Sequence, residues 1–251
     1  MKTPPILTLA AILLIGAAAH AQTAVRFGMR SGAGRAITTL DPASNYSGTY
    51  PFSGSADKAA IFAWQAGVVL EASFGQWAVQ PALLFSQKGE KLHAATYASG
   101  VAGYNTQETT STNRYNWLEL PLNVVYTLHG DHGLQLFAGP YVALAVGGRQ
   151  RGTREGAFYG PPTYSVPSTY ASEEFDQSLE YGPSSTNQRF DAGLQGGVGY
   201  RQGPVQVQLG YSLGLLNLHH ASDQREFGRD VNADAAYNRG AQLTGTYFFN
   251  L

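Results

Sequence analysis

The chain has 251 residues, of which 13% are charged, and its formal net charge is −1. This balance gives no reason to expect a nucleic acid or a charged surface as a partner. The lack of cysteine excludes disulfides and thiolate metal sites, and the length predicts a single folded domain.

The N-terminal segment has the parts of a secretory signal peptide. Lys2 supplies a positive charge, residues 6–18 form an uncharged apolar run, and Ala19-His20-Ala21 provides a small-x-small cleavage pattern. We expect cleavage after Ala21, so that residues 1–21 are the signal and residues 22–251 the mature domain. An uncleaved anchor helix is the alternative, but the apolar run is short for one.

Alternation of apolar and polar residues dominates the mature part of the chain. From Val205 to Leu215 every second residue is apolar or Tyr, and Gln, Gly and Ser lie between them. This period of two predicts strands with one apolar and one polar face. Their lengths suit tilted spans of a bilayer, which need about 9–11 residues. The expected strands cover residues 24–33, 60–74, 77–91, 115–128, 134–148, 189–201, 205–218 and 238–251.

The segments between these strands are alternately short and long. The short ones are 75–76, 130–133 and 202–204, and the long ones are 34–59, 92–114, 149–188 and 219–237. Transmembrane barrels sort their connections in this way. The sequence therefore predicts an all-β, antiparallel, up-and-down transmembrane barrel of about eight strands, with short periplasmic turns and long extracellular loops. We expect the protein to reach the cell outer membrane by Sec export, where the lipid bilayer surrounds it.

Charged residues on the polar strand faces are expected to point into the lumen. A barrel of about eight strands is just wide enough for side chains to fill it. An ion path is one interpretation, but we favour a structural network of paired charges, because unpaired buried charges cost several kcal/mol. The predicted members are Arg26, Arg30, Glu71, Glu119, Asp191 and Arg201. Arg26 and Glu71 are expected to lie within reach of each other on adjacent strands.

Some strand features conflict with a regular ladder. Pro81, Pro121 and Pro140 fall inside expected strands, where each removes a hydrogen-bond donor, and we interpret them as sites of β-bulges. The run Leu83-Leu84-Phe85 is apolar on both faces, so it does not define which residue points inward. Aromatic residues near the strand ends are expected to form interfacial girdles. The candidates are Trp64, Phe74, Trp77, Trp117, Tyr126, Tyr200 and Tyr247.

Several of the expected strands carry motifs that resemble the PorT-type outer-membrane β-barrel family. The motifs are QPALLFSQKGEKL (80–92), NWLELPLNVVYTL (116–128), FAGPYVAL (137–144), YSLGLLNL (211–218) and NRGAQLTGTYFF (238–249). The resemblance implies a barrel in the outer membrane, and a few members of that family resemble accessory parts of a secretion system. Leu243, Tyr247, Phe249 and Leu251 also resemble the C-terminal signal read by the outer-membrane assembly machinery, which is therefore an expected partner.

Functional chemistry is sparse in the sequence. The most specific group is His220 and Ser222, with Glu226 nearby, which could serve a lipid A-modifying enzyme at the membrane rim. This spacing is not specific, so we expect no enzymatic activity, no cofactor and no metal site. The tyrosines of 149–188 could anchor a protein partner or a glycan, or they could equally pack against one another within the loop. We therefore expect a non-enzymatic surface barrel for partner docking, adhesion or accessory work in secretion, with an enzyme or a narrow pore as the alternatives.

Overall fold

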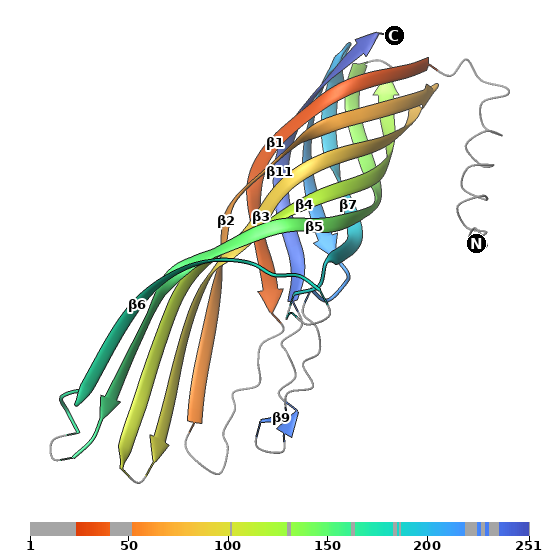
Figure 1. Cartoon of the computed structure of the whole chain (residues 1–251). Helices are drawn as coiled ribbons and strands as arrows, with labels where there is room; N and C mark the ends of the chain where they lie inside the picture. The colour runs from red at the N-terminus through yellow and green to blue at the C-terminus, as the bar shows by residue number, and fades with distance from the viewer. Residues whose placement is uncertain are drawn as a thin grey trace, which may run out of the picture.

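The computed structural model describes most of residues 24–250 (Figure 1). The described residues are 24–40, 52–100, 102–129, 132–161, 164–182, 185, 187–218, 225–226, 229–230 and 236–250. No helix among them is long and apolar enough to cross a membrane. The predicted signal peptide and the pair His220 and Ser222 lie outside the described residues.

Almost all of the described chain is β-strand. The strands are β1 (Ala24–Leu40), β2 (Phe52–Phe74), β3 (Trp77–Gly100), β4 (Gly103–His129), β5 (His132–Tyr159), β6 (Thr169–Ser178), β7 (Phe190–Gln202), β8 (Val205–Gly214), β9 (Arg225–Glu226), β10 (Arg229–Asp230) and β11 (Ala236–Asn250). β9 and β10 pair only with each other. The other nine belong to one antiparallel sheet.

That sheet closes on itself. Its strand order is β4-β3-β2-β1-β11-β8-β7-β5-β6, and an additional pairing of β4 with β5 completes a ring. Every strand of the nine except β6 belongs to the ring, which is therefore a barrel of eight strands. Closure leaves no unpaired edge at membrane depth, where backbone groups have no water to bond. The prediction of an all-β antiparallel barrel is confirmed.

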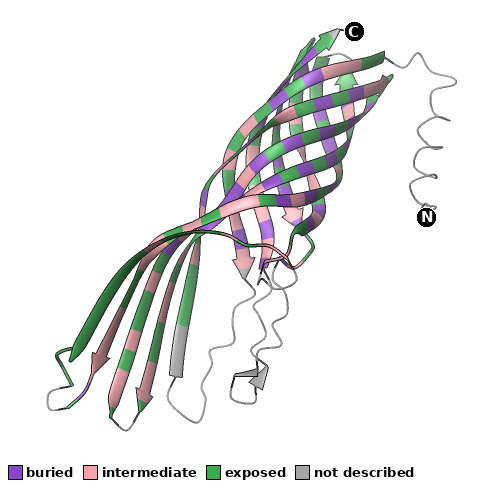
Figure 2. Cartoon of the chain, viewed as in Figure 1, coloured by how far each residue is buried: buried purple, intermediate pink, exposed green. Residues whose placement is uncertain are grey.

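Residues that alternate between apolar and polar along the strands also alternate between exposed and buried in the barrel (Figure 2). On β8, Val205, Val207 and Leu209 point outward, while Gln206 and Gln208 are buried. The outer face is apolar because it faces lipid, and the inner face is polar because it faces other side chains.

The ambiguous run on β3 has a definite orientation. The exposed fraction is 42% for Leu83 and 37% for Phe85 but only 2% for Leu84. Leu84 therefore lies in the lumen, and the same parity places Gln80 and Glu90 there as well. The lumen-facing residues of β3 are therefore the even-numbered ones.

Tight turns join the strands at one end of the barrel. Gly75, with φ of 64°, links β2 to β3, and Gly203, with φ of 56°, links β7 to β8. Left-handed backbone is where glycine is favoured, because it has no Cβ.

The prediction that 34–59, 92–114 and 149–188 are loops is wrong in large part, because β1 extends to Leu40 and β2 begins at Phe52. β3 and β4 continue as a hairpin beyond the barrel, β5 continues beside them, and β6 adds to the outer half of β5. With the outer part of β2 they form an open five-stranded extension, which we call the projecting sheet (Figure 1). It comprises residues 52–60, 91–100, 103–112, 149–159 and 169–178.

The prolines do not mark bulges. Pro81 pairs with Leu122, and the ladder resumes at Leu84 and Glu119 with the same spacing on both strands. A missing donor removes one hydrogen bond without inserting a residue, so the register is kept. Among the described strands the register shifts occur elsewhere, namely at Ala60/Trp64, Asn116/Trp117 and Thr127/His129.

One of the predicted girdle residues points the other way. Trp117 is 1% exposed and lies in the lumen, because it shares the parity of Glu119 on β4. Trp77 and Tyr126 do pack together on the outer face near the tight turns, with ring centroids 4.9 Å apart. They suit the amphipathic interface of a bilayer.

Candidate functional site

The structure places all six charged residues of the predicted lumen network on the inner face of the barrel. Arg26 is partly buried, and the other five are 5% exposed or less. Three of them join one cluster around Glu71, whereas Glu119 and Asp191 belong to a second cluster further along the lumen. Glu71 accepts from Arg201 at 2.7 Å and pairs with Arg26, its register partner on β1, at 3.5 Å.

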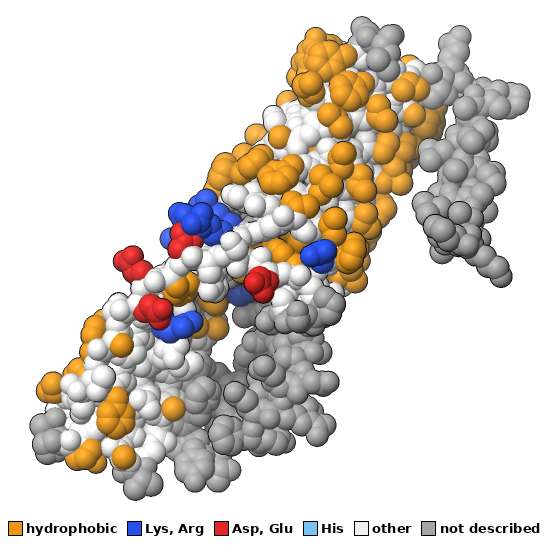
Figure 3. Space-filling model, viewed as in Figure 1, with side chains coloured by type: hydrophobic (Ala, Val, Ile, Leu, Met, Phe, Trp, Pro, Cys, Tyr) orange, Lys and Arg blue, Asp and Glu red, His pale blue; other side chains and the backbone are white. Residues whose placement is uncertain are grey.

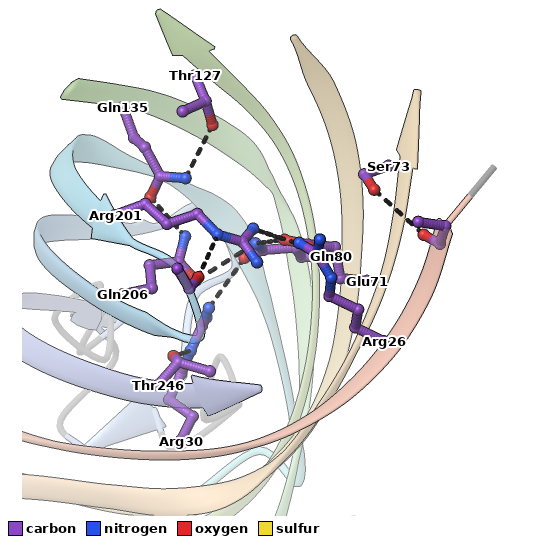
Figure 4. A network of polar contacts seen from close by, with 12 residues as sticks. Arg26, Arg30, Glu71, Ser73, Gln80, Thr127, Gln135, Arg201, Gln206 and Thr246 are labelled. Carbon is purple, nitrogen blue, oxygen red and sulfur yellow. Dashed lines mark hydrogen bonds and ion pairs between the residues drawn. The ribbon is translucent and has the colours of Figure 1, made fainter. Parts of the chain in front are cut away.

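The cluster around Glu71 extends into one hydrogen-bonded network that reaches every strand of the ring (Figure 4). Gln80 donates to Glu71 at 2.7 Å and to Gln206 at 3.3 Å, and it accepts from Arg30 at 3.0 Å. Because each strand contributes at least one member, the network ties the barrel wall together from inside. Its members are Arg26 and Arg30 (β1), Glu71 (β2), Gln80 (β3), Thr127 (β4), Gln135 (β5), Arg201 (β7), Gln206 (β8) and Thr246 (β11).

A second polar cluster crosses the middle of the lumen. Lys88 pairs with Glu119 at 2.7 Å and lies over the ring of Tyr141, 5.2 Å from its centroid. Asp191 accepts hydrogen bonds from Tyr141 at 3.1 Å and from Asn238 at 2.9 Å. These contacts give both buried carboxylates polar partners, an ion pair for Glu119 and two hydrogen bonds to Oδ2 for Asp191, whose Oδ1 has no partner within the described structure.

The mouth of the barrel opposite the tight turns is closed by protein. Glu90 accepts from Asn113 at 2.9 Å and from Tyr115 at 3.1 Å, forming a third polar layer. Between this layer and the Glu119 cluster, an apolar cluster fills the lumen, including side chains from the connections after β6 and β8. Its members are Tyr115, Trp117, Tyr141, Ala143, Ala145, Leu218 and Ala236, with Leu179 and Tyr181 packed against them.

Several lumen residues were missed by reasoning from sequence. Gln80 and Gln206 carry no charge, and nothing in the sequence singles them out as connectors. Lys88 and Glu90 follow the apolar run at Leu83 to Phe85, which hides the parity of β3. Gln80 points into the lumen, and Lys88 and Glu90 follow it at even spacings. The alternation of the strand therefore places both charged side chains in the lumen as well.

No open passage runs through the described part of the lumen. The enclosed space between Arg30, Asn123 and Gln208 has a volume of about 10 Å³, which is room for a single water molecule. Within the same residues, no group of His, Asp and Glu is arranged to hold a metal ion. The described lumen is therefore a packed polar core.

A packed lumen leads to a prediction about conductance. Purified protein in a planar bilayer is expected to give no discrete channel openings, because three polar layers and the apolar cluster block the path. A large-diameter porin measured in the same bilayers provides the positive control. Discrete, voltage-stable openings of the unmodified protein would contradict this interpretation and support the narrow pore.

The projecting sheet carries a groove on the face that continues the outer wall of the barrel. Its volume is about 530 Å³, and Tyr97, Tyr159 and Tyr170 line it together with Glu108 and Glu155. Three of the tyrosines that were predicted to lie in a loop at 149–188 occupy two different places in the structure. Tyr159 and Tyr170 lie in the groove, and Tyr181 packs against the apolar cluster in the lumen.

The groove tyrosines belong to a stacked aromatic row. The rings of Tyr104 and Tyr159 lie 4.6 Å apart and are nearly parallel, and Tyr97 lies 5.3 Å from Tyr104. Stacking holds these rings in fixed positions on adjacent strands. A rigid aromatic row at a polar surface is a common feature of binding surfaces, because it offers contact area at low entropic cost.

The groove carboxylates face each other. Glu108 and Glu155 are register partners on β4 and β5, and like charges in this position repel. His93 lies 3.6 Å from Glu108, and among the described residues no cation pairs with Glu155. The groove is therefore suited to receive a positively charged group.

Two solved structures are among those similar to this chain. The translocator domain of the autotransporter NalP from Neisseria meningitidis is 12% identical, with a TM-score of 0.26, covering 98% of this chain and 95% of that one. A TodX monoaromatic hydrocarbon channel mutant is 8% identical, with a TM-score of 0.24, covering 92% and 91%. Scores this low carry no argument about the fold or the function of this chain. No curated protein sequence matches the chain.

A family model gives the stronger result. The model described as the outer membrane protein beta-barrel domain matches residues 20–220, which is most of the chain. The match includes β1 to β8, so it covers seven of the eight ring strands and the projecting sheet, and it ends before β11. The chain belongs to the outer membrane protein beta-barrel domain family.

Proposed function

We propose that this protein is a non-enzymatic outer-membrane barrel that displays the projecting sheet at the cell surface to dock a protein partner. The carrying observation is the Tyr- and Glu-lined groove on a sheet that extends beyond the barrel. Ten residues of β3 extend past Glu90, which is about 30 Å at 3.3 Å per residue. A barrel that needed only to span the membrane would not require this extension.

The charge of the groove indicates the chemistry of the partner. Glu108 and Glu155 repel each other across β4 and β5, so a Lys or Arg side chain placed between them would relieve the repulsion. The tyrosine rings on either side can pack on the aliphatic part of such a side chain. We therefore propose a partner that presents a basic residue within an apolar surface.

The finer family assignment and the assembly partner are also proposals. We propose that the chain is of PorT type, with an accessory role in secretion, because the resembling motifs fall on β3, β4, β5, β8 and β11. We also propose that the outer-membrane assembly machinery reads β11. Leu243, Tyr247 and Phe249 support this, since all three are exposed on its outer face.

Site-specific photocross-linking in whole cells tests the docking proposal. A photoreactive phenylalanine analogue at Tyr170, in the groove, is expected to yield a discrete adduct with another protein. The matched control is the same analogue at Ala171, which neighbours Tyr170 on β6 but faces the opposite side of the sheet. Adding Glu108→Gln and Glu155→Gln is expected to reduce the adduct at 170.

Two results would overturn the docking proposal. The first is equal cross-linking at 170 and 171, which would indicate non-specific capture. The second is an unchanged adduct after both glutamates are neutralised, which would remove the assigned role of the groove carboxylates.

A further inference from the structure

A cluster of cations lies on the outer face of β3, β4 and β5, where the projecting sheet joins the barrel. Lys91, Arg114, Arg149 and Arg151 project from β3, β4 and β5, and we call them the basic cluster. Arg114 and Arg149 are register partners, so two guanidinium groups start from directly opposite positions. Lys91 and Arg151 flank Thr112 on either side in the same row. Figure 3 shows blue side chains gathered where the orange outer wall of the barrel ends.

The positive charge of the cluster is only partly balanced. Asp176 on β6 pairs with Arg149 at 2.8 Å and with Arg151 at 2.7 Å. The hydrogen bond from Arg149 lowers the pKa of the Asp176 carboxyl, so this carboxyl remains charged in mildly acidic medium. No other described carboxylate forms an ion pair with the cluster. Four cations and one anion leave an excess of positive charge.

The position of the cluster along the barrel is set by the outer face of β4. From Tyr126 to Leu118 the outward residues are apolar or aromatic, Asn116 follows, and Arg114 comes next. The ten residue-to-residue steps from 126 to 116 span about 33 Å of strand, or roughly 25 Å of membrane thickness at the usual strand tilt. That is the height of the apolar band of an outer-membrane barrel. Arg114 therefore lies at the level of the headgroups.

The same order appears on the neighbouring strands. On β3, Phe85 is followed by Gln87 and then Lys91, and on β5, Val146 is followed by Arg149. Gln87 donates to Asn116 at 2.9 Å, so a row of amides separates the apolar band from the basic cluster. A cluster placed just beyond hydrocarbon meets lipid headgroups before any other ligand.

We propose that the basic cluster binds the phosphorylated headgroup of a glycolipid in the outer leaflet of the outer membrane. Guanidinium groups bind phosphate through paired hydrogen bonds, and a phosphate between Arg114 and Arg149 would offset their repulsion. The acyl chains of such a lipid would lie against Leu118 and its outward neighbours. This inference rests on the family's location in the outer membrane and is independent of partner docking at the groove.

Lipid binding by the purified full-length protein in detergent tests this proposal. Bisphosphorylated lipid A is expected to remain bound in native mass spectrometry, whereas chemically dephosphorylated lipid A binds at least about tenfold more weakly. The variant with Arg114→Gln, Arg149→Gln and Arg151→Gln is expected to lose lipid A affinity by at least about tenfold. Inorganic phosphate at the same concentration is expected not to compete, because it lacks acyl chains to hold it at the cluster.

Two further variants separate binding from folding. Arg154→Gln removes a cation from the opposite face of β5, so it is the matched control and should leave lipid A binding unchanged. Asp176→Asn removes the competing carboxylate and is expected to keep or increase the affinity. Equal loss for Arg154→Gln and the triple variant would overturn the proposal. So would a loss in Asp176→Asn as large as that in the triple variant, or full competition by inorganic phosphate.

Discussion

Glu71→Gln is expected to reduce the free energy of unfolding by about 3–5 kcal/mol, the usual cost of removing one partner of a buried ion pair. Glu71 is fully buried, and its carboxylate holds Arg201 at 2.7 Å and Arg26 at 3.5 Å. Arg201 is itself 3% exposed, so it would keep an unpaired charge in the lumen. Urea titration of the protein folded into lipid vesicles, followed by tryptophan fluorescence, measures the loss.

A double-mutant cycle identifies the cause of this loss. Adding Arg201→Gln to Glu71→Gln is expected to recover part of the stability, because it removes the charge that the first substitution leaves unpaired. Glu155→Gln is the matched control, since Glu155 lies on the projecting sheet and forms no ion pair within the described structure. It should change stability by no more than about 0.5 kcal/mol. Equal effects of Glu71→Gln and Glu155→Gln would show that the lumen network is not what holds the barrel together.

The barrel and one of its ion pairs could be predicted because their causes are local. Val205 to Leu215 alternate strictly, and this pattern is what a wall between lipid and a polar lumen requires. Arg26 and Glu71 were expected on adjacent strands because both sit near the end of the barrel that carries the tight turns. Their register pairing and 3.5 Å contact follow from that geometry.

The projecting sheet could not be predicted, because its stability comes from neighbouring strands and not from its own pattern. Residues Thr109 to Thr112 are small and polar on both faces, so they show no period of two with respect to hydrophobicity. A strand of this kind forms only when its backbone pairs on both sides, as β4 does with β3 and β5. The polar sequence of such a segment, considered without its neighbouring strands, favours a loop.

The groove on the projecting sheet could not be predicted from the sequence for a similar reason. The sequence indicates Tyr159 and Tyr170 as candidate binding residues of one predicted loop. Tyr97 and Tyr104 lie in a different predicted loop, more than fifty positions earlier in the chain. Only the pairing of β3, β4 and β5 brings them into one row. Glu108 and Glu155 are likewise unremarkable until the register places them opposite each other.

Leu120→Arg is expected to reduce the free energy of unfolding by about 2–4 kcal/mol, the cost of a cation at the bilayer midplane. Leu120 is 53% exposed on the outer face of β4, near the middle of the apolar run from Tyr126 to Leu118. An arginine there would have to leave the hydrocarbon along its own side chain or draw water inward. Urea titration in vesicles measures the cost.

Thr110→Arg is the matched control for the bilayer, because it adds the same side chain to the same face of the same strand. Position 110 lies beyond the basic cluster on the projecting sheet, where the outer face meets water. We expect a change of no more than about 0.5 kcal/mol there, as for most surface substitutions. The difference between the two variants therefore measures the change of solvent along one strand. Equal costs at 110 and 120 would mean that the outward apolar residues of β4 do not lie in hydrocarbon, and that the headgroup position assigned to Arg114 is wrong as well.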